Sequence, residues 1–227
     1  MPFARLTVQY RMHPALAQFS SDQFYDGKIV NGVTAKERIS EFPFPKSSVP
    51  LFFLDVPGKE SAGKAGVSYS NKSELESVES VVEMLLLAGI PELEIGVITP
   101  YKLQKKVLTK NLDMPGIDIN SVDAFQGREK DFIIVSTVRA NNEAKIGFLD
   151  DPRRMNVMLT RARRGLIVVG CAHTLASGSQ SGGIWNEFLQ YMDKLQVVFT
   201  GSLDSLRKVV FTKDEDCFFT GVYGRNS

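Results

Sequence analysis

Arginine, glycine and acidic residues gather in one stretch of the chain, residues 121–164. It opens with a polar loop that contains glycine, residues 121–131, and it closes with an arginine-rich segment, residues 156–163. Arginine presents a planar, permanently charged fork that matches the oxygens of a phosphate group. The residue types at the two ends therefore favour a site for one polyanion, with an apolar strand between them.

The arginine-rich segment is predicted to lie on a helix that runs from Asp151 to Gly165. Asp151 is a suitable N-cap, Pro152 fits the first turn, and Gly165 ends the pattern. Successive helical residues are offset by about 100°, so Arg161 and Arg163 would point to different sides. We therefore expect one to face a phosphate and the other a carboxylate. The alternative is a basic helix surface that faces solvent, which the buried strand that follows disfavours.

Another arginine, Arg11, lies in the polar segment at residues 9–14. The alternation of Leu6, Val8 and Tyr10 predicts a brief strand, and Pro14 can start a helix over residues 14–25. Arg11 would then lie in a loop from strand to helix, where functional side chains are often placed. On spacing alone, an ordinary surface arginine is the favoured interpretation.

The segment at residues 58–65 nearly matches the phosphate-binding loop G-x-x-x-x-G-K-[ST]. Ala65 replaces the hydroxyl that would bind Mg²⁺, and no helix is expected to follow. We interpret it as an exposed loop. A complete ATP-hydrolysing site also needs a phosphate-binding lysine and an Mg²⁺ carboxylate. From its residues alone, this chain can contribute arginines to such a site but cannot supply all the groups that the site needs.

Strands and helices are predicted to alternate, which indicates an α/β fold with a parallel sheet. Continuous apolar runs at 132–138 and 166–170 are typical of strands covered on both faces. The clearest helix, 71–88, has Asn71 as its cap and Glu74 as the expected partner in a capping box. Ligands bind such sheets at the carboxyl ends of the strands. This rule places the loops after Tyr10, Thr99, Val122 and Val138 along one edge.

The composition is that of an ordinary globular chain of 227 residues, with 43% hydrophobic and 23% charged residues. The net charge of +1 predicts that any contact with nucleic acid uses a local patch. The two cysteines, Cys171 and Cys217, favour a reducing compartment, so we expect a cytoplasmic protein. Neither a signal peptide nor an apolar run of membrane-spanning length is visible, so no membrane contact is expected.

Three segments in this order, QYRMHP at 9–14, VDAFQGREKD at 122–131 and NVMLTRAR at 156–163, resemble consecutive motifs of superfamily 1 helicases. The segments at 24–27, 31–35 and 146–154 are most similar to the branch of this family that acts in nonsense-mediated mRNA decay. The resemblance implies the second of two RecA-like domains, a three-layer sandwich with a mainly parallel sheet. We assign this domain to residues 1–200. Residues 201–227 are expected to form an appendage that is partly disordered.

The resemblance also implies roles for individual residues. ATP would contact Tyr10, Arg11, Gly127, Glu129 and Arg161, with Arg11 and Arg161 as the two catalytic arginine fingers. The groove for nucleic acid would be lined by Thr99, Pro100, Ser121, Val122 and Asp123, through contacts with sugar and phosphate that do not depend on sequence. Gln126 and Arg139 would couple the nucleotide to that groove.

ATP with Mg²⁺ is the implied cofactor, and the metal ligands are expected on the first RecA-like domain. The implied partners are single-stranded RNA or DNA, that first domain, and mRNA decay factors. The function expected by resemblance is that of an ATP-dependent helicase working 5′ to 3′ on RNA, and this chain alone should be inactive. Two alternatives stay open: a DNA-directed helicase domain of the same superfamily, and a binding module for nucleic acid or a protein partner that has lost ATP turnover.

Overall fold

The apolar runs of the sequence form one six-stranded sheet in which all strands are parallel. The computed structural model describes residues 6–64, 66–178 and 183–212. In sheet order the strands are β10 (Val198–Phe199), β3 (Leu51–Asp55), β9 (Ala162–Gly170), β8 (Lys130–Ser136), β6 (Ile95–Ile98) and β7 (Asp118–Asn120). The central strands β8 and β9 are almost entirely buried, as expected for a sheet covered on both faces.

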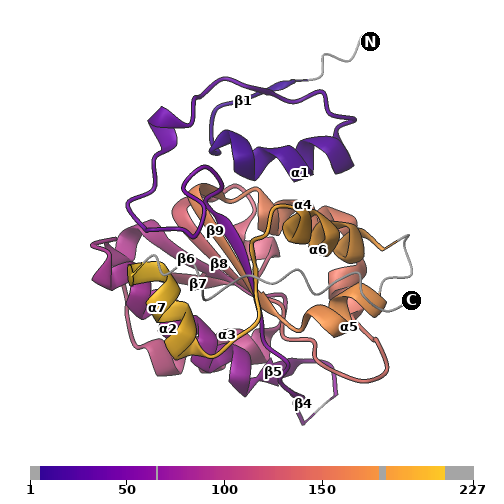
Figure 1. Cartoon of the computed structure of the whole chain (residues 1–227). Coiled ribbons are helices and arrows are strands. Elements are labelled where there is room, and N and C mark those ends of the chain that lie inside the picture. The colour runs from indigo at the N-terminus through magenta and orange to yellow at the C-terminus, as the bar shows by residue number, and fades with distance from the viewer. Residues whose placement is uncertain (1–5, 65, 179–182, 213–227) are drawn as a thin grey trace.

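Helices cover both faces of this sheet and make a three-layer sandwich (Figure 1). One layer contains α2 (Lys72–Leu87), α3 (Lys102–Leu112) and α7 (Leu203–Thr212), and the other contains α4 (Pro152–Leu159), α5 (Ala172–Ser177) and α6 (Ile184–Lys194). Helix α1 (Pro14–Phe24) packs on the second layer, where the rings of Phe19 and Phe188 lie 5.0 Å apart. The predicted α/β fold with a parallel sheet is confirmed.

Short elements complete the described fold. The strands β1 (Val8–Gln9) and β2 (Val30–Asn31) pair in parallel, and 3-10 turns occupy Lys36–Arg38, Glu92–Glu94, Asp123–Phe125 and Gly147–Asp150. The predicted loop at residues 58–66 is wrong in part, because β4 (Glu60–Ala62) and β5 (Tyr69–Asn71) form an antiparallel hairpin there. Lys64 lies exposed near the tip of this hairpin. No helix starts at Lys64, because β5 comes next and α2 begins only at Lys72, so the near match to a phosphate-binding loop lacks the expected structure.

The prediction that the arginine-rich helix reaches Gly165 is wrong. Helix α4 ends at Leu159, because the Thr160 hydroxyl donates to the carbonyl of Asn156 (2.6 Å) and the Arg161 side chain to that of Val157 (3.0 Å). Strand β9 then starts at Ala162, which pairs with Lys130 of β8. Gly165 serves close packing, since a Cβ there would lie 2.7 Å from the ring of Phe132. Sheet pairing overrides the local helix preference.

Helix α2 confirms one half of the predicted capping box and corrects the other. The Asn71 side chain accepts a hydrogen bond from the Glu74 backbone N–H (3.2 Å), as an N-cap does. The Glu74 side chain does not return to Asn71. It is fully buried and accepts hydrogen bonds from the loop after β8 instead.

The C-terminal segment contains a helix that the sequence pattern did not predict. Leu206, Val209 and Val210 of α7 are buried in the core, and α7 packs on α2. Residues 213–227, most of the predicted appendage, lie outside the described residues, and the domain boundary at residue 200 stays a prediction. In the described residues, no helix combines the length and the apolar character that crossing a membrane requires.

Candidate functional site

The loop between β1 and α1 holds Arg11 in a fixed place. The side-chain oxygen of Gln9 accepts hydrogen bonds from the backbone N–H groups of Arg11 (3.0 Å) and Met12 (2.8 Å). From the other side, the Arg38 guanidinium donates to the carbonyls of Tyr10 and Arg11, both at 2.8 Å. The backbone of this loop is therefore well ordered by side chains, which favours a functional role for Arg11 over an ordinary surface arginine.

Arg11 and Arg161 meet at Thr160. Arg11 Nη1 donates to the Thr160 carbonyl (2.9 Å), and Arg161 Nη2 donates to the Thr160 hydroxyl (2.9 Å). Burial, followed by the positive charge of Arg11, lowers the pKa of Arg161. Two guanidinium groups placed this closely repel each other, so the arrangement favours an anion between them.

Glu129 supplies a negative charge at this place. Its carboxylate is ion-paired with Arg11 and lies 3.7 Å from Arg163 Nη1. The hydrogen bond from Arg11 lowers the pKa of Glu129, so the carboxylate is held in its charged form. Gly127 lies close in sequence with φ of +85° and with open space where a side chain would be. Its backbone is therefore accessible to a ligand.

Arg163 has a different set of partners from Arg161. It is ion-paired with Asp131, as is the neighbouring Arg164 at 3.3 Å. The expectation that one of the two arginines faces a carboxylate agrees with these contacts, but the helical offset given as its reason is wrong. Both Arg163 and Asp131 lie on paired parallel strands, so the strand register brings them together.

A cavity of about 180 Å³ lies beside the two converging arginines. Its walls come from β1, α1 and the end of α4, and they include Gln9, Arg11, Ser20, Tyr25, Thr160 and Arg161. Tyr10 lies outside this cavity and is 66% exposed. Its ring rests on Gly32, where a Cβ would lie 2.3 Å from a ring atom, so the outer ring face is available for stacking.

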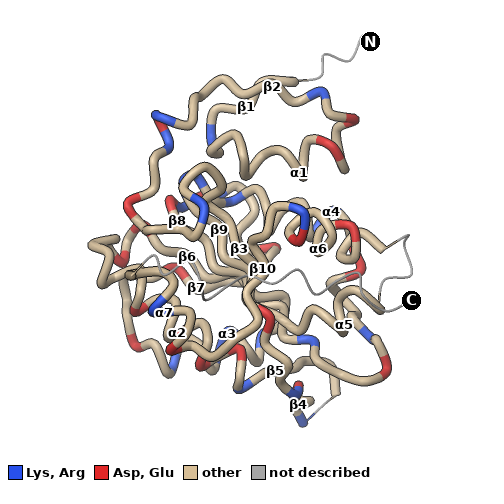
Figure 2. Tube along the Cα trace, viewed as in Figure 1, with Lys and Arg blue, Asp and Glu red and all other residues tan. Residues whose placement is uncertain are grey.

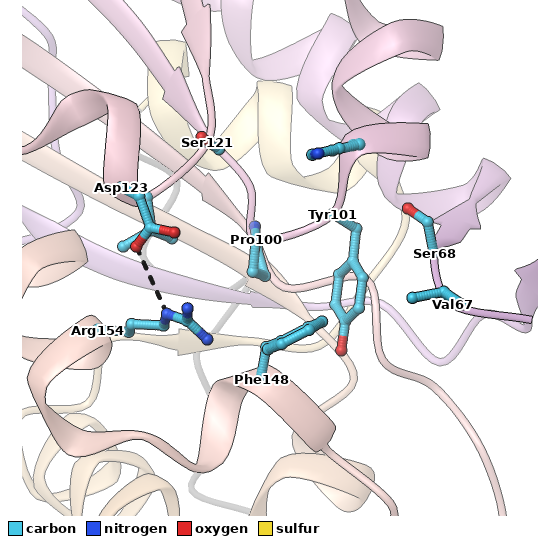
Figure 3. A pocket seen from close by; sticks show the side chains of 10 residues that line it. Val67, Ser68, Pro100, Tyr101, Ser121, Asp123, Phe148 and Arg154 are labelled. Carbon is cyan, nitrogen blue, oxygen red and sulfur yellow. Dashed lines mark ion pairs between the residues drawn. The ribbon is translucent and has the colours of Figure 1, made fainter.

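A second cavity, of about 280 Å³, lies at the carboxyl ends of β6 and β7 (Figure 3). We call it the groove pocket. Phe148 stands on its wall with 48% of its surface exposed, and the Arg154 guanidinium lies 5.1 Å from that ring. Arg154 is also ion-paired with Asp123 at 3.5 Å. The remaining walls are formed by Val67, Ser68, Pro100, Tyr101, Lys102, Ser121 and Val122.

The residues predicted for nucleic-acid contact are brought together here, but their side chains are not equally accessible. Pro100, Ser121 and Asp123 line the pocket directly. Val122 lines it with only 3% of its surface exposed, whereas Thr99 is fully buried and is not among the lining residues. A ligand in this pocket would therefore meet Pro100, Ser121, Val122 and Asp123 but not Thr99.

The two predicted coupling residues are separated by the structure. Gln126 is exposed in the segment that joins Asp123, at the groove pocket, to Gly127 and Glu129. Arg139 is 5% exposed and lies at an adjoining cavity lined by Tyr69, Tyr101, Gly147, Phe148 and Arg154.

Arg139 is held by a bidentate ion pair with Glu60, at 2.9 and 3.0 Å, and by a contact with the Tyr101 hydroxyl at 3.3 Å. Its guanidinium also stacks on the ring of Tyr69, at 4.4 Å. Gly147 leaves room for it, because a Cβ there would lie 2.7 Å from Arg139 Nη1.

Several residues of these sites were not predicted as site residues, among them Glu60, Tyr101, Phe148 and Arg154. Phe148 and Arg154 lie within segments that resemble the helicases, so their positions were a usable signal. Glu60 gave none, because it lies in a stretch interpreted as a loop. Charge alone would not have located the sites, since basic and acidic residues are interspersed over the chain (Figure 2).

Comparison with known proteins agrees with this geometry. The sequence pattern of the AAA domain family matches residues 1–173, so the chain belongs to this family. A solved C-terminal domain of a possible DNA helicase from Lactobacillus plantarum has a TM-score of 0.45 at 16% identity, covering 78% of this chain and 92% of that one. At this TM-score the likeness adds nothing to the assignment.

Within this class, the chain is similar to regulator of nonsense transcripts 1. It is 45% identical to the Drosophila melanogaster homologue over 218 residues, which is 91% of this chain and 18% of that protein. It is 41% identical over 215 residues to "ATP-dependent helicase NAM7" of Saccharomyces cerevisiae, covering 89% of this chain and 22% of that protein. The chain thus spans about a fifth of the length of these relatives. The resemblance to helicases of nonsense-mediated decay is confirmed.

Proposed function

We propose that this chain is the C-terminal motor domain of an ATP-dependent RNA helicase of nonsense-mediated mRNA decay, working 5′ to 3′ in the cytoplasm. The convergence of Arg11 and Arg161 at Thr160, beside the carboxylate of Glu129, is the observation that carries this proposal. The names of the relatives support the reaction class, since two of them are called ATP-dependent helicases.

Arg11 and Arg161 would stabilise the negative charge that develops on the γ-phosphate during transfer. Arg11 is ion-paired with Glu129, and phosphate oxygens would replace the carboxylate in this contact. The exposed ring of Tyr10 would stack on the adenine or beside the sugar, and the open backbone of Gly127 would contact the nucleotide. ATP arrives with Mg²⁺, whose ligands we assign to the first RecA-like domain.

The groove pocket would bind single-stranded RNA through Pro100, Ser121, Val122 and Asp123, which line it. Phe148 adds an aromatic face, which is the usual platform for a nucleobase. Gln126, between this pocket and Glu129, would transmit the nucleotide state along one continuous segment. Decay factors are the expected protein partners.

RNA-stimulated ATP turnover by the full-length protein tests this proposal. We expect Arg161→Ala to lower turnover by about a hundredfold or more while ATP still binds, because an arginine finger acts on the transition state. Arg161→Lys keeps the charge but loses the planar fork, so it should recover little activity.

Arg153→Ala is the matched control, because the Arg153 side chain is 90% exposed on the neighbouring helix and pairs only locally with Asp151. The Arg153→Ala protein should turn over ATP at the wild-type rate. Unchanged turnover in Arg161→Ala would favour a binding module without catalysis. Equal or greater stimulation by single-stranded DNA would favour a DNA-directed helicase.

A further inference from the structure

Val138 has a backbone conformation that its side chain disfavours. Its φ is +74°, and it is a β-branched residue that is fully buried directly after β8. The left-handed region costs a residue with a branched Cβ about 1–3 kcal/mol, and such strain persists only when its surroundings enforce it. The next residue is Arg139, so the strained turn sets the direction in which Arg139 leaves the sheet.

Two side chains, one from the N-cap and one from the first turn of α2, hold Val138 in this conformation from both sides. The Glu74 carboxylate accepts a hydrogen bond from the Val138 N–H (2.8 Å), and the Asn71 amide donates to the Val138 carbonyl (3.1 Å). Glu74 also accepts from the hydroxyls of Ser136 (2.7 Å) and Thr137 (3.4 Å). Both Asn71 and Glu74 are fully buried.

The clamping residues are tied in turn to α3 by Gln104. Its side-chain oxygen accepts from the Asn71 N–H (2.9 Å), and its amide group donates to the Asn71 carbonyl (3.3 Å) and to Ser136 Oγ (3.1 Å). Gln104 is also fully buried. It lies in the first turn of α3, which directly follows Tyr101, a wall of the groove pocket. The network therefore joins the start of α2, the start of α3 and the end of β8.

We propose that Glu74 and Asn71 form a clamp that holds Val138 in the left-handed conformation and thereby positions Arg139 at the groove pocket for RNA-stimulated turnover. The proposal rests on the proposed helicase function. From this turn Arg139 reaches Glu60, Tyr101 and the ring of Tyr69, and its cavity shares Phe148 and Arg154 with the groove pocket. Glu74 is thus a positioning residue, because it acts through Arg139 and not on a ligand.

ATP turnover of the full-length protein at increasing RNA concentrations tests the clamp. For Glu74→Ala we expect RNA-stimulated kcat to fall by about tenfold, with the KM for ATP and the RNA-independent rate within about twofold of wild type. Glu74→Gln should keep most of the stimulation, since its amide oxygen still accepts from the Val138 N–H. Glu76→Ala, which removes an exposed carboxylate of the same helix, is the matched control and should behave as wild type.

A second substitution separates this role from a general loss of stability. Glycine adopts a positive φ without strain, so Val138→Gly in the Glu74→Ala background should restore RNA stimulation to within about threefold of wild type. If Glu74 served only to satisfy buried polar groups, Val138→Gly would remove further core packing and would restore nothing. Failure of this rescue while Val138→Gly alone is active, or full stimulation in Glu74→Ala, would overturn the clamp.

A crystal structure of the Glu74→Ala chain provides a readout that does not depend on function. We expect Val138 to leave the left-handed region and the Arg139–Glu60 ion pair to be lost. A Val138 φ that stays near +74° in this variant would overturn the clamp, whatever the activity of the protein. Absence of RNA-stimulated turnover in the wild-type protein would instead count against the proposed helicase function. The two failures are therefore distinguishable.

Discussion

Thr160 shows how a single residue can organise charge at a binding site. Its carbonyl accepts a hydrogen bond from Arg11 and its hydroxyl accepts one from Arg161, so two cations are held side by side. The carboxylate of Glu129 offsets part of the repulsion through Arg11. Exchange of this carboxylate for a phosphate would change the partners of Arg11 without moving the backbone, which the contacts of Gln9 and Arg38 hold in place.

This reasoning predicts how Arg11 contributes. We expect Arg11→Ala to lower kcat for RNA-stimulated ATP turnover by about a hundredfold and to weaken nucleotide binding far less, because its guanidinium is needed most where charge develops. Single-turnover kinetics with a separate binding titration would measure both effects. A loss confined to affinity would show that Arg11 binds the ground state only.

Phe148 permits a prediction for the groove pocket. Stacking of a base on an aromatic ring contributes about 1–3 kcal/mol, so Phe148→Ala should weaken binding of single-stranded RNA by roughly tenfold. Phe148→Trp should retain affinity. Fluorescence anisotropy with a short labelled RNA would measure it. Phe211→Ala is the control, since Phe211 is similarly exposed, at 45%, on α7. Equal affinities for Phe148→Ala and wild type would exclude stacking on this ring.

At the scale of elements, local sequence predicted the buried strands β8 and β9 and several helices, but it missed the β4–β5 hairpin and misplaced the end of α4. Apolar runs and the Asn71 and Asp151 caps are local signals, and the structure uses them as predicted. The change from helix to strand after Leu159 depends on pairing with Lys130 in β8, a contact that no local pattern contains. The ion pair of Arg139 with Glu60 likewise needs a hairpin that brings distant segments together.

The buried carboxyl group of α2 gives a prediction for stability against pH. Burial raises the pKa of Glu74 from 4.5 to about 7, so the folded chain favours its neutral form. Its hydrogen-bond partners, Ser136, Thr137 and the Val138 N–H, are uncharged. The stabilising contribution is therefore complete below about pH 4.5 and is lost as the pH rises through about 7.

From this group alone, the free energy of unfolding should fall by on the order of 3 kcal/mol between about pH 4.5 and pH 8. Glu74→Gln cannot ionise and should remove that part of the slope. Urea denaturation across this range would measure it, with Glu76→Gln as a control that keeps the wild-type slope. A slope that is the same in Glu74→Gln and wild type would show that Glu74 does not titrate in this range.

At the scale of the whole molecule, the groove pocket and the arginine pair are joined by the segment from Ser121 to Glu129. Under the proposed function, this continuity would let one domain respond to a nucleotide and to RNA together. The arginine pair would nevertheless form only one wall of a nucleotide site. The near phosphate-binding loop is part of the β4–β5 hairpin, so its Lys64 leads into a strand and not into the N-terminus of a helix.

We therefore expect this chain by itself to hydrolyse ATP at a negligible rate, with or without RNA. Arg11 and Arg161, as proposed arginine fingers, would lower the barrier only when a lysine and Mg²⁺ already hold the phosphates, and we assign those groups to the first RecA-like domain. The rate of ATP hydrolysis would be measured as phosphate release by this chain and by the full-length protein under the same conditions. Turnover by this chain at the full-length rate would place every catalytic group on this one sheet edge and would refute a cleft shared between two domains.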